Sequence, residues 1–385
     1  MKRVVAATMA VLLMSAAVAP AATASTGATS ADASTQSAEA FAGAHVSFQT
    51  EGNALTNYTV DGQTVAENVT VESASAYEGR LGLGADVRLS AVTNLAGAST
   101  SLSAETETSA TVETGGSAEL RAHDSEHGQL VVDAGGESQY VQANLSEDAE
   151  TEQHGESRLT VETADGGEAT YLVVGDGEVT ANEEGDVAAS LSGDAQLVVR
   201  TYDESRDESD ERIEQYVANG TATAEAYVTE RSGEVVNSTV AYGQETSVEA
   251  SQTAENEVTV TVDRAESEGK ILVTSVSEAA VGSVEDLNVT VDGEAAAEVE
   301  SYSELEGAIG NEPRYMVVGE GSADADATVL VGIDHFSERR VTMSGDGSSD
   351  GGSGDDGSSD DGSPGFGVLA GLTALLSAAG IARRR

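Results

Sequence analysis

Apolar and polar residues alternate with a period of two through most of the chain from Phe41 onward. One clear example places Val65, Val69 and Val71 between polar residues. Turn-forming pairs interrupt the alternation, among them Asp61-Gly62, Gly115-Gly116, Asp165-Gly166, Asp176-Gly177 and Gly193-Asp194. Short strands joined by tight turns are typical of antiparallel sandwiches and barrels. The pattern therefore predicts an all-β fold, without the alternating helices of a parallel βαβ architecture.

A charged stretch after Tyr202 divides this pattern into two regions. We predict two antiparallel β-sandwich-like domains, the first over 40–205 and the second over 206–343. Ile213, Tyr216 and Val217 have helical spacing, which predicts a short helix over 208–218 that packs between the domains. A charged linker is the alternative interpretation of that segment.

Two further segments refine the prediction. Ser301 to Glu304 has the form of a capping box before Leu305, which predicts a second short helix in the later domain. Residues 288–291 and 294–299, joined by Asp292-Gly293, predict a hairpin. By contrast, 96–115 is polar on both faces of any strand, and a β-solenoid stays open as an alternative for the first domain.

Composition adds an unusual surface to this fold. The 385 residues carry a net charge of -50, from 68 acidic and 18 basic residues. In molar salt the screening length falls to about 3 Å, so such a surface favours a hypersaline environment. The charge disfavours nucleic acid as a partner, because nucleic acid requires basic contacts. Cysteine is absent, so apolar burial has to supply the core.

The first residues have the form of a secretory signal peptide, predicted over 1–24. A basic start precedes an apolar run, and small residues before Ser25 predict cleavage between Ala24 and Ser25. Residues 25–39 are rich in Ala, Ser and Thr, and we expect a flexible lead-in there.

The opposite end combines a polar stalk with an apolar segment. Residues 344–363 are Gly, Ser and Asp without an apolar residue, which predicts an extended acidic stalk. An apolar helix over 366–382 would extend about 25 Å, against a hydrocarbon thickness near 30 Å. Arg383, Arg384 and Arg385 would stop transfer through the membrane and stay cytoplasmic.

The tripeptide Pro364, Gly365, Phe366, the apolar helix and the basic terminus together resemble the PGF-type C-terminal sorting signal of haloarchaeal surface proteins. The resemblance covers 364–385 alone. It implies that an archaeosortase, a membrane transpeptidase, removes the tail and joins the new end to a membrane lipid. An ordinary single-pass membrane anchor is the alternative.

Sequons for N-glycosylation are numerous in the predicted ectodomain. The six candidate acceptors are Asn57, Asn68, Asn144, Asn219, Asn237 and Asn288. A chain rich in Asn, Ser and Thr produces some sequons by accident, so we expect only part of this set to be occupied.

Residues that could carry chemistry are few. His123 and His127 lie four apart, a spacing that suits a metal on a helix, but their surroundings predict a solvated loop between strands. Neither this pair nor Asp334-His335 has an evident third ligand. No nucleophile elbow or phosphate-binding loop is found. We therefore predict no catalytic residue, no metal site and no cofactor.

These features predict a secreted, membrane-anchored surface protein with a structural or adhesive role in the cell envelope and no enzymatic activity. Expected partners are the membrane, the processing enzyme and a surface layer or further copies of the chain. A surface-displayed binding module for a sugar or ion is the alternative function. An extracellular enzyme is the weakest alternative.

Overall fold

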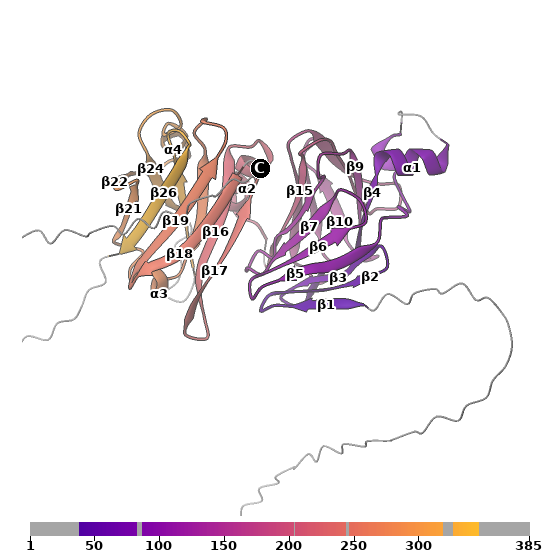
Figure 1. Ribbon diagram of the computed structural model, residues 1–385, viewed down its shortest axis with the longest axis horizontal. Coiled ribbons are helices and arrows are strands. Elements are labelled where there is room, and N and C mark those ends of the chain that lie inside the picture. Colours follow the sequence, from indigo (N-terminus) through magenta and orange to yellow (C-terminus); the bar gives the residue numbers. More distant parts are fainter. Residues whose placement is uncertain (1–37, 83–86, 204, 244–245, 319–325, 346–385) are drawn as a thin grey trace, which may run out of the picture. The chain divides into compact units, whose positions relative to one another are not determined.

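The computed structural model describes residues 38–82, 87–203, 205–243, 246–318 and 326–345, and within them the chain is nearly all β (Figure 1). The predicted signal peptide, its cleavage site at Ala24 and Ser25, most of the lead-in, nearly all of the stalk and the whole sorting tail lie outside these residues. No helix among the described residues is long and apolar enough to span a membrane.

Two sheets enclose the first core. Sheet A has the order β1 (Glu39–Ala42), β2 (Val46–Glu51), β3 (Ala54–Val60), β4 (Gln63–Ser73), β9 (Gln139–Asn144), β14 (Val187–Leu191) and β13 (Gly177–Ala181). Sheet B has the order β10 (Glu150–Gln153), β11 (Arg158–Glu162), β12 (Glu168–Val174), β15 (Gln196–Tyr202), β8 (Leu130–Asp133), β7 (Glu119–His123), β6 (Ser109–Thr114) and β5 (Thr100–Glu105). Val71 and Val141 of sheet A share a buried cluster with Leu120 and Leu197 of sheet B.

Two more sheets enclose a second core. Sheet C has the order β17 (Glu234–Ala241), β16 (Ala222–Arg231), β20 (Ile271–Val276), β25 (Ala327–Gly332), β24 (Arg314–Val318) and β23 (Ala297–Glu298). Sheet D has the order β18 (Thr246–Ala254), β19 (Glu257–Arg264), β26 (Glu338–Gly345), β21 (Leu287–Val291) and β22 (Glu294–Ala295). Val258, Val260 and Val262 of β19 pack against Leu272 and Val331, as their alternation with threonine predicts.

Sheet C departs from the expected antiparallel pattern at two places. β16 pairs with β20 in parallel, and the two-residue β23 pairs in parallel with β24. All other strand pairs among the described residues are antiparallel. The predicted all-β fold of sandwich-like sheet pairs is therefore confirmed, and sheet C is mixed rather than purely antiparallel.

Helix α2 (Glu208–Ala218) connects the two sandwiches and has the predicted bounds. Asp207 caps it, since its side chain accepts from the backbone N–H of Asp210 while the Asp210 carboxylate accepts from the N–H of Asp207. Ile213 and Val217 are buried in a third cluster that contains residues of sheets B and C. This burial contradicts the charged-linker alternative. Because the described residues form one compact unit, independent folding of 40–205 and 206–343 stays a prediction.

The predicted turn at Asp61-Gly62 and the predicted hairpin at Asp292-Gly293 are confirmed. The second strand of the latter hairpin, expected over 294–299, ends at Ala295, because residues 297–298 pair with β24 of sheet C instead. Asp61 and Gly62 have φ values of 48° and 82° between β3 and β4, and Asp292 and Gly293 have 52° and 84° between β21 and β22. Two central residues with positive φ give the turn a twist that matches the flanking strands.

The solenoid alternative for the first domain is wrong. Its polar stretch forms the antiparallel hairpin β5–β6 at the end of sheet B, where strand β5 is largely exposed. A strand at the border of a sheet needs few apolar residues, because only part of its surface contacts the core.

Helices were underpredicted. The structure adds α1 (Ala74–Leu81), α3 (Glu278–Val281) and the 3₁₀ turn η1 (Leu89–Ala91) to the predicted α2 and α4 (Tyr302–Glu306). α1 contacts sheet A through Tyr77, which packs against Tyr140, and through Arg80, which pairs with Glu72 of β4 at 2.9 Å. Tyr77 is its one buried residue, so the sequence shows no helical period there. The capping box expected before α4 is wrong, because the Ser301 hydroxyl donates to the Glu304 carboxylate instead of binding the backbone.

Candidate functional site

The turn from His123 to His127 joins β7 to β8, and its residues 123–125 are buried rather than solvated as the sequence suggested, whereas Glu126 is exposed and His127 half-buried. Asp124 has no exposed surface, and its carboxylate accepts the backbone N–H groups of Ala44, His45 and Val46 at 2.8 Å each. Arg231 of β16 donates to the same carboxylate at 2.6 Å. Burial alone would raise the pKa of Asp124, but these hydrogen bonds and Arg231 hold it below its ordinary value.

The two histidines of this turn lie in different surroundings inside the protein. His123 is 7% exposed, and the Nδ1 atom of His127 lies 3.1 Å from the carbonyl oxygen of Thr201. Burial, followed by the charge of Arg121 for His123 and of Arg200 for His127, lowers both pKa values to about 4. Within the ranges that the structure describes, no three His, Asp or Glu side chains are placed to share a metal ion. Both imidazoles are therefore neutral at pH 7.

A buried ion pair crosses from the first sandwich to the second. Arg200 of β15 donates to Glu225 of β16, and these side chains are 2% and 1% exposed. The Glu225 carboxylate also accepts from Gln129 at 3.0 Å, from Tyr242 at 2.7 Å and from Tyr227. Burial would raise the pKa of Glu225, but Arg200 and the tyrosine hydroxyls hold it below its ordinary value. We call Arg200, Glu225, Gln129, Tyr227 and Tyr242 the central network.

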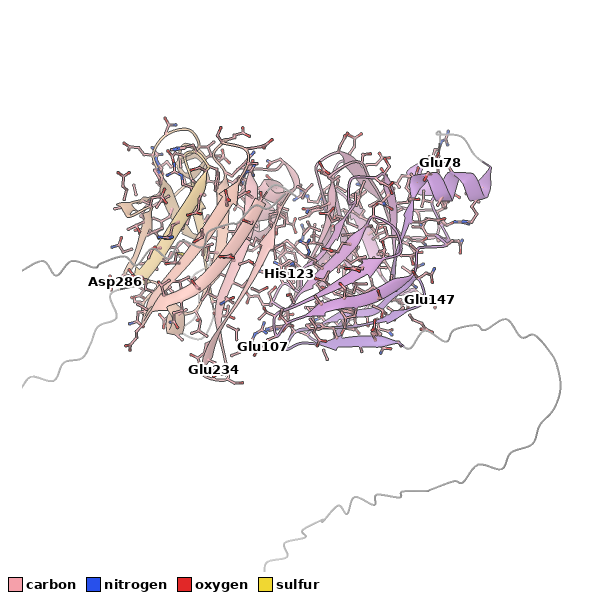
Figure 2. The ribbon with its side chains drawn as sticks, viewed as in Figure 1. Glu78, Glu107, His123, Glu147, Glu234 and Asp286 are labelled. Atoms are coloured by element: carbon pink, nitrogen blue, oxygen red, sulfur yellow. The ribbon has the colours of Figure 1, made fainter. Side chains whose placement is uncertain are left out.

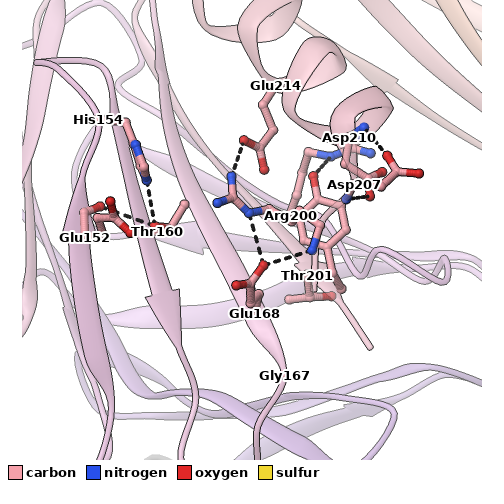
Figure 3. A network of polar contacts seen from close by, with 12 residues as sticks. Glu152, His154, Thr160, Gly167, Glu168, Arg200, Thr201, Asp207, Asp210 and Glu214 are labelled. Atoms are coloured by element: carbon pink, nitrogen blue, oxygen red, sulfur yellow. Dashed lines mark hydrogen bonds and ion pairs between the residues drawn. The ribbon is translucent and has the colours of Figure 1, made fainter. Parts of the chain in front are cut away.

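A third buried carboxylate fixes helix α2. Glu214 has no exposed surface and accepts from Arg206 at 2.8 Å and from Arg158 at 3.2 Å. Arg206 also donates to Glu168 of β12, so the helix, the preceding segment and sheet B are joined (Figure 3). The two arginines balance the negative charge of the Glu214 carboxylate, which is buried away from water.

Two cavities adjoin the central network. The larger one, of about 370 Å³, is lined by Asp124, Glu126, Arg231 and Asp326, among others. The smaller one, of about 180 Å³, also borders Glu126. Burial and the charge of Asp326 raise the pKa of Glu126 to about 6. The larger cavity is thus an acidic recess of a size that suits a small polar ligand.

The predicted acceptor asparagines lie on strands and turns of both sandwiches. Asn57, Asn219, Asn237 and Asn288 are exposed, whereas Asn68 and Asn144 are half-buried. Asn68 and Asn144 lie directly opposite each other on β4 and β9. At Asn219 the side-chain oxygen accepts from the backbone N–H of Thr221 at 2.9 Å. This Asx turn leaves the side-chain nitrogen of Asn219 facing solvent.

Asn144 is expected to remain unmodified. Its Nδ2 atom, which a glycan would occupy, donates to Asp186 at 2.7 Å, and Asp186 also accepts the N–H of Leu145 at 3.0 Å. Glycopeptide mass spectrometry of the native protein should find Asn219 modified more often than Asn144 by at least about tenfold, the ratio that a loss of one such hydrogen bond implies. Equal occupancy at the two positions would contradict this assignment.

Residues 363–385 match the PGF-CTERM motif. The chain therefore carries the sorting signal that Pro364, Gly365 and Phe366 suggested, and it is a secreted, surface-anchored protein whose tail is a substrate signal for archaeosortase processing. The sorting residues and Arg383, Arg384 and Arg385 lie outside the described residues.

The other comparisons add little. No curated protein matches the chain. A polysaccharide lyase of known structure is similar at 10% identity with a TM-score of 0.23, over 79% of this chain. The chain spans 47% of that structure, about half of its length, and a similarity this low carries no argument about fold or activity.

Proposed function

We propose that this protein is a haloarchaeal surface protein with a structural or adhesive role in the cell envelope and no enzymatic activity. The observation that carries the proposal is the sorting motif at 363–385, behind an acidic stalk and a fold of two joined sandwiches. The buried titratable groups support a structural role, because Asp124, Glu214 and Glu225 are all bound to arginines.

The charge of the chain supports the hypersaline setting. Exposed carboxylates cover both sandwiches, including Glu107, Glu147, Glu234 and Asp286 (Figure 2). At low ionic strength these charges repel one another, and molar salt removes most of that repulsion. N-glycans on the exposed asparagines would add a further hydrophilic layer.

A second candidate function is the display of a binding site for a sugar or ion. The acidic recess of about 370 Å³ beside Glu126 and Asp326 favours it, since its lining combines carboxylates with Arg231 and Asn237. Ligand titration followed by protein fluorescence or calorimetry in molar salt distinguishes this candidate from a purely structural role.

Replacement of Pro364, Gly365 and Phe366 by alanine should leave a precursor that keeps its tail, because the processing enzyme loses its recognition sequence. Intact-mass measurement of membrane fractions then gives a heavier protein than wild type. Cell–cell aggregation in molar salt should also fall, because adhesion requires correct anchoring. Replacement of Ser358 and Ser359 in the stalk by alanine is the matched control and should be processed normally. A wild-type protein that retains residues 364–385 would refute tail removal and favour a single-pass anchor.

A further inference from the structure

The acidic recess lies between the two sandwiches, and its walls are tied together. On one side Arg231 of β16 binds the buried carboxylate of Asp124. On another side the Thr108 hydroxyl donates to the carbonyl oxygen of Asn237 at 2.9 Å, and the Ser238 hydroxyl donates to that of Thr108 at 3.4 Å. The recess is therefore formed before any ligand enters, which lowers the cost of binding.

Three carboxylates line this recess, those of Glu126, Glu230 and Asp326. Across the described ranges of the chain, none of the three accepts a hydrogen bond, and the Nε2 atom of His127 lies 4.0 Å from Glu126. Partial burial and the charge of Asp326 raise the pKa of Glu126 to about 6, so these two carboxylates lie close enough to repel each other. A ligand that donates hydrogen bonds to them is favoured, whereas an anionic ligand is repelled.

A second cavity, of about 330 Å³, lies where β17 contacts β18, and we call it the β17–β18 cavity (Figure 1). Its lining combines hydroxyl side chains with small apolar ones and one carboxylate, namely Thr239, Ser251, Thr261, Val248, Ala250 and Glu249. Asn237 lines both cavities and is exposed. An extended ligand can therefore cross from one cavity to the other over the Asn237 side chain.

This arrangement favours a chain of sugars over an ion. A metal ion needs several ligand atoms within about 2.6 Å of one point, and the described residues hold no three His, Asp or Glu side chains so placed. An oligosaccharide carries hydroxyls at intervals along its length, so it can bind polar groups that are spread over two cavities. Molar salt weakens the attraction of a cation to carboxylates, but it does not screen hydrogen bonds to a neutral ligand.

We propose that a neutral oligosaccharide binds across β17, with one sugar in the acidic recess and the next in the β17–β18 cavity. In the recess its hydroxyls donate to Glu126 and Asp326, and in the β17–β18 cavity they bind Ser251 and Thr261. Asn237 lies between the two sugars, so its sequon should be one of those without a glycan. The proposal rests on the second candidate function above and names the ligand class of that displayed site.

Titration of the full-length protein in molar salt with neutral trisaccharides tests the proposal. The probes are maltotriose, cellotriose, mannotriose and chitotriose, each followed by calorimetry or saturation-transfer NMR. At least one should bind saturably, and its monosaccharide should bind at least about tenfold more weakly, because a single sugar fills only one cavity. Absence of saturable binding for all four probes overturns the proposal.

A variant of the recess identifies the site. Glu126→Gln should weaken trisaccharide binding at least about tenfold, because a carboxylate is a stronger acceptor than an amide. The Glu126 side chain is 46% exposed, so the fold should be spared, which denaturation midpoints check. Glu147→Gln is the matched control, since Glu147 is exposed and lines neither cavity, and it should bind like wild type. Equal binding by Glu126→Gln and wild type, or stoichiometric calcium binding that Glu126→Gln abolishes, overturns the proposal.

A variant of the β17–β18 cavity tests the extended ligand. Thr261→Val removes a hydroxyl at nearly constant shape, so it should weaken binding of the trisaccharide and leave that of the monosaccharide in the recess unchanged. Equal trisaccharide binding by Thr261→Val and wild type, or a glycan on most copies of Asn237 in the native protein, overturns the proposal. Normal tail processing without any sugar binding overturns this inference alone and leaves the proposed surface role in place.

Discussion

Glu225→Ala is expected to lower the free energy of unfolding by about 3–5 kcal/mol, because Arg200 would remain charged inside the protein without its partner. The same substitution leaves the hydroxyls of Tyr227 and Tyr242 without their acceptor. Chemical denaturation in molar salt measures the loss. Glu266→Ala is the exposed control, since its pair with Arg264 is solvated on the glutamate side and should contribute less than about 1 kcal/mol.

A double variant separates the charge from the shape of this site. Replacing Arg200 by Met and Glu225 by Leu removes both charges together, so the double variant should be more stable than Glu225→Ala. It should stay less stable than wild type, because the hydroxyls of Tyr227 and Tyr242 still lack their acceptor. A double variant as unstable as Glu225→Ala would show that packing and hydrogen bonding, not the unpaired charge, cause the loss.

Acidification from pH 6.5 toward pH 4 is expected to destabilise the fold by up to about 3 kcal/mol for each of the two turn histidines. Glu126, whose pKa is raised to about 6, offsets part of this loss, because the folded state binds its proton more readily than the unfolded chain. The folded pKa of His123 and of His127 is about 4, below the ordinary value of 6.5. The unfolded chain therefore binds more protons in this window, so stability is retained above pH 6.5 and is lost as the pH falls. The lowered pKa values of Asp124 and Glu225 add a further loss below about pH 4.

Denaturation midpoints at several pH values in constant salt measure this slope. His123→Gln should flatten it, because the buried imidazole no longer takes up a proton on unfolding. His335→Gln is the matched control, since that side chain is 61% exposed, and it should keep the wild-type slope. Equal slopes in wild type and His123→Gln would contradict the assignment of the acid sensitivity to the buried turn.

The period-two pattern predicted the strands because each sandwich buries one face of each sheet. Asp61-Gly62 predicted a turn and Asp292-Gly293 predicted a hairpin through local backbone geometry alone. Helix α2 was predictable for a similar reason, since Ile213, Tyr216 and Val217 mark one buried stripe. The sequence was therefore sufficient to predict those strands, turns and helices whose backbone conformation is decided by residues close together in the chain.

The central network and the neighbouring contacts of Asp124 were missed because both depend on contacts between distant strands. Asp124 binds backbone groups about 80 residues earlier and Arg231 more than 100 residues later. Its neighbours His123 and His127 looked like parts of a polar turn for the same reason. One local signal existed: Arg200 follows the apolar run Leu197 to Val199, and Glu225 stands among alanines of β16. An isolated charge in a buried strand indicates a buried partner.

The chain's composition explains why polar contacts join the sandwiches. Aromatic residues make up 4% of the chain and cysteine is absent, so neither large aromatic clusters nor disulfides can fix the junction. The third apolar cluster supplies burial, whereas directional hydrogen bonds at Glu225, Asp124 and Glu214 restrict the geometry.

Strand β26 has a mechanical consequence for an anchored protein. It is the last described strand, it lies between β19 and β21, and the chain leaves it at Gly345 toward the stalk. Tension between the cell and anything attached to the ectodomain would enter the fold along this strand. Two hydrogen-bonded ladders would then share the load, so the fold is expected to resist pulling from its anchored end better than it would if the chain left from a border strand.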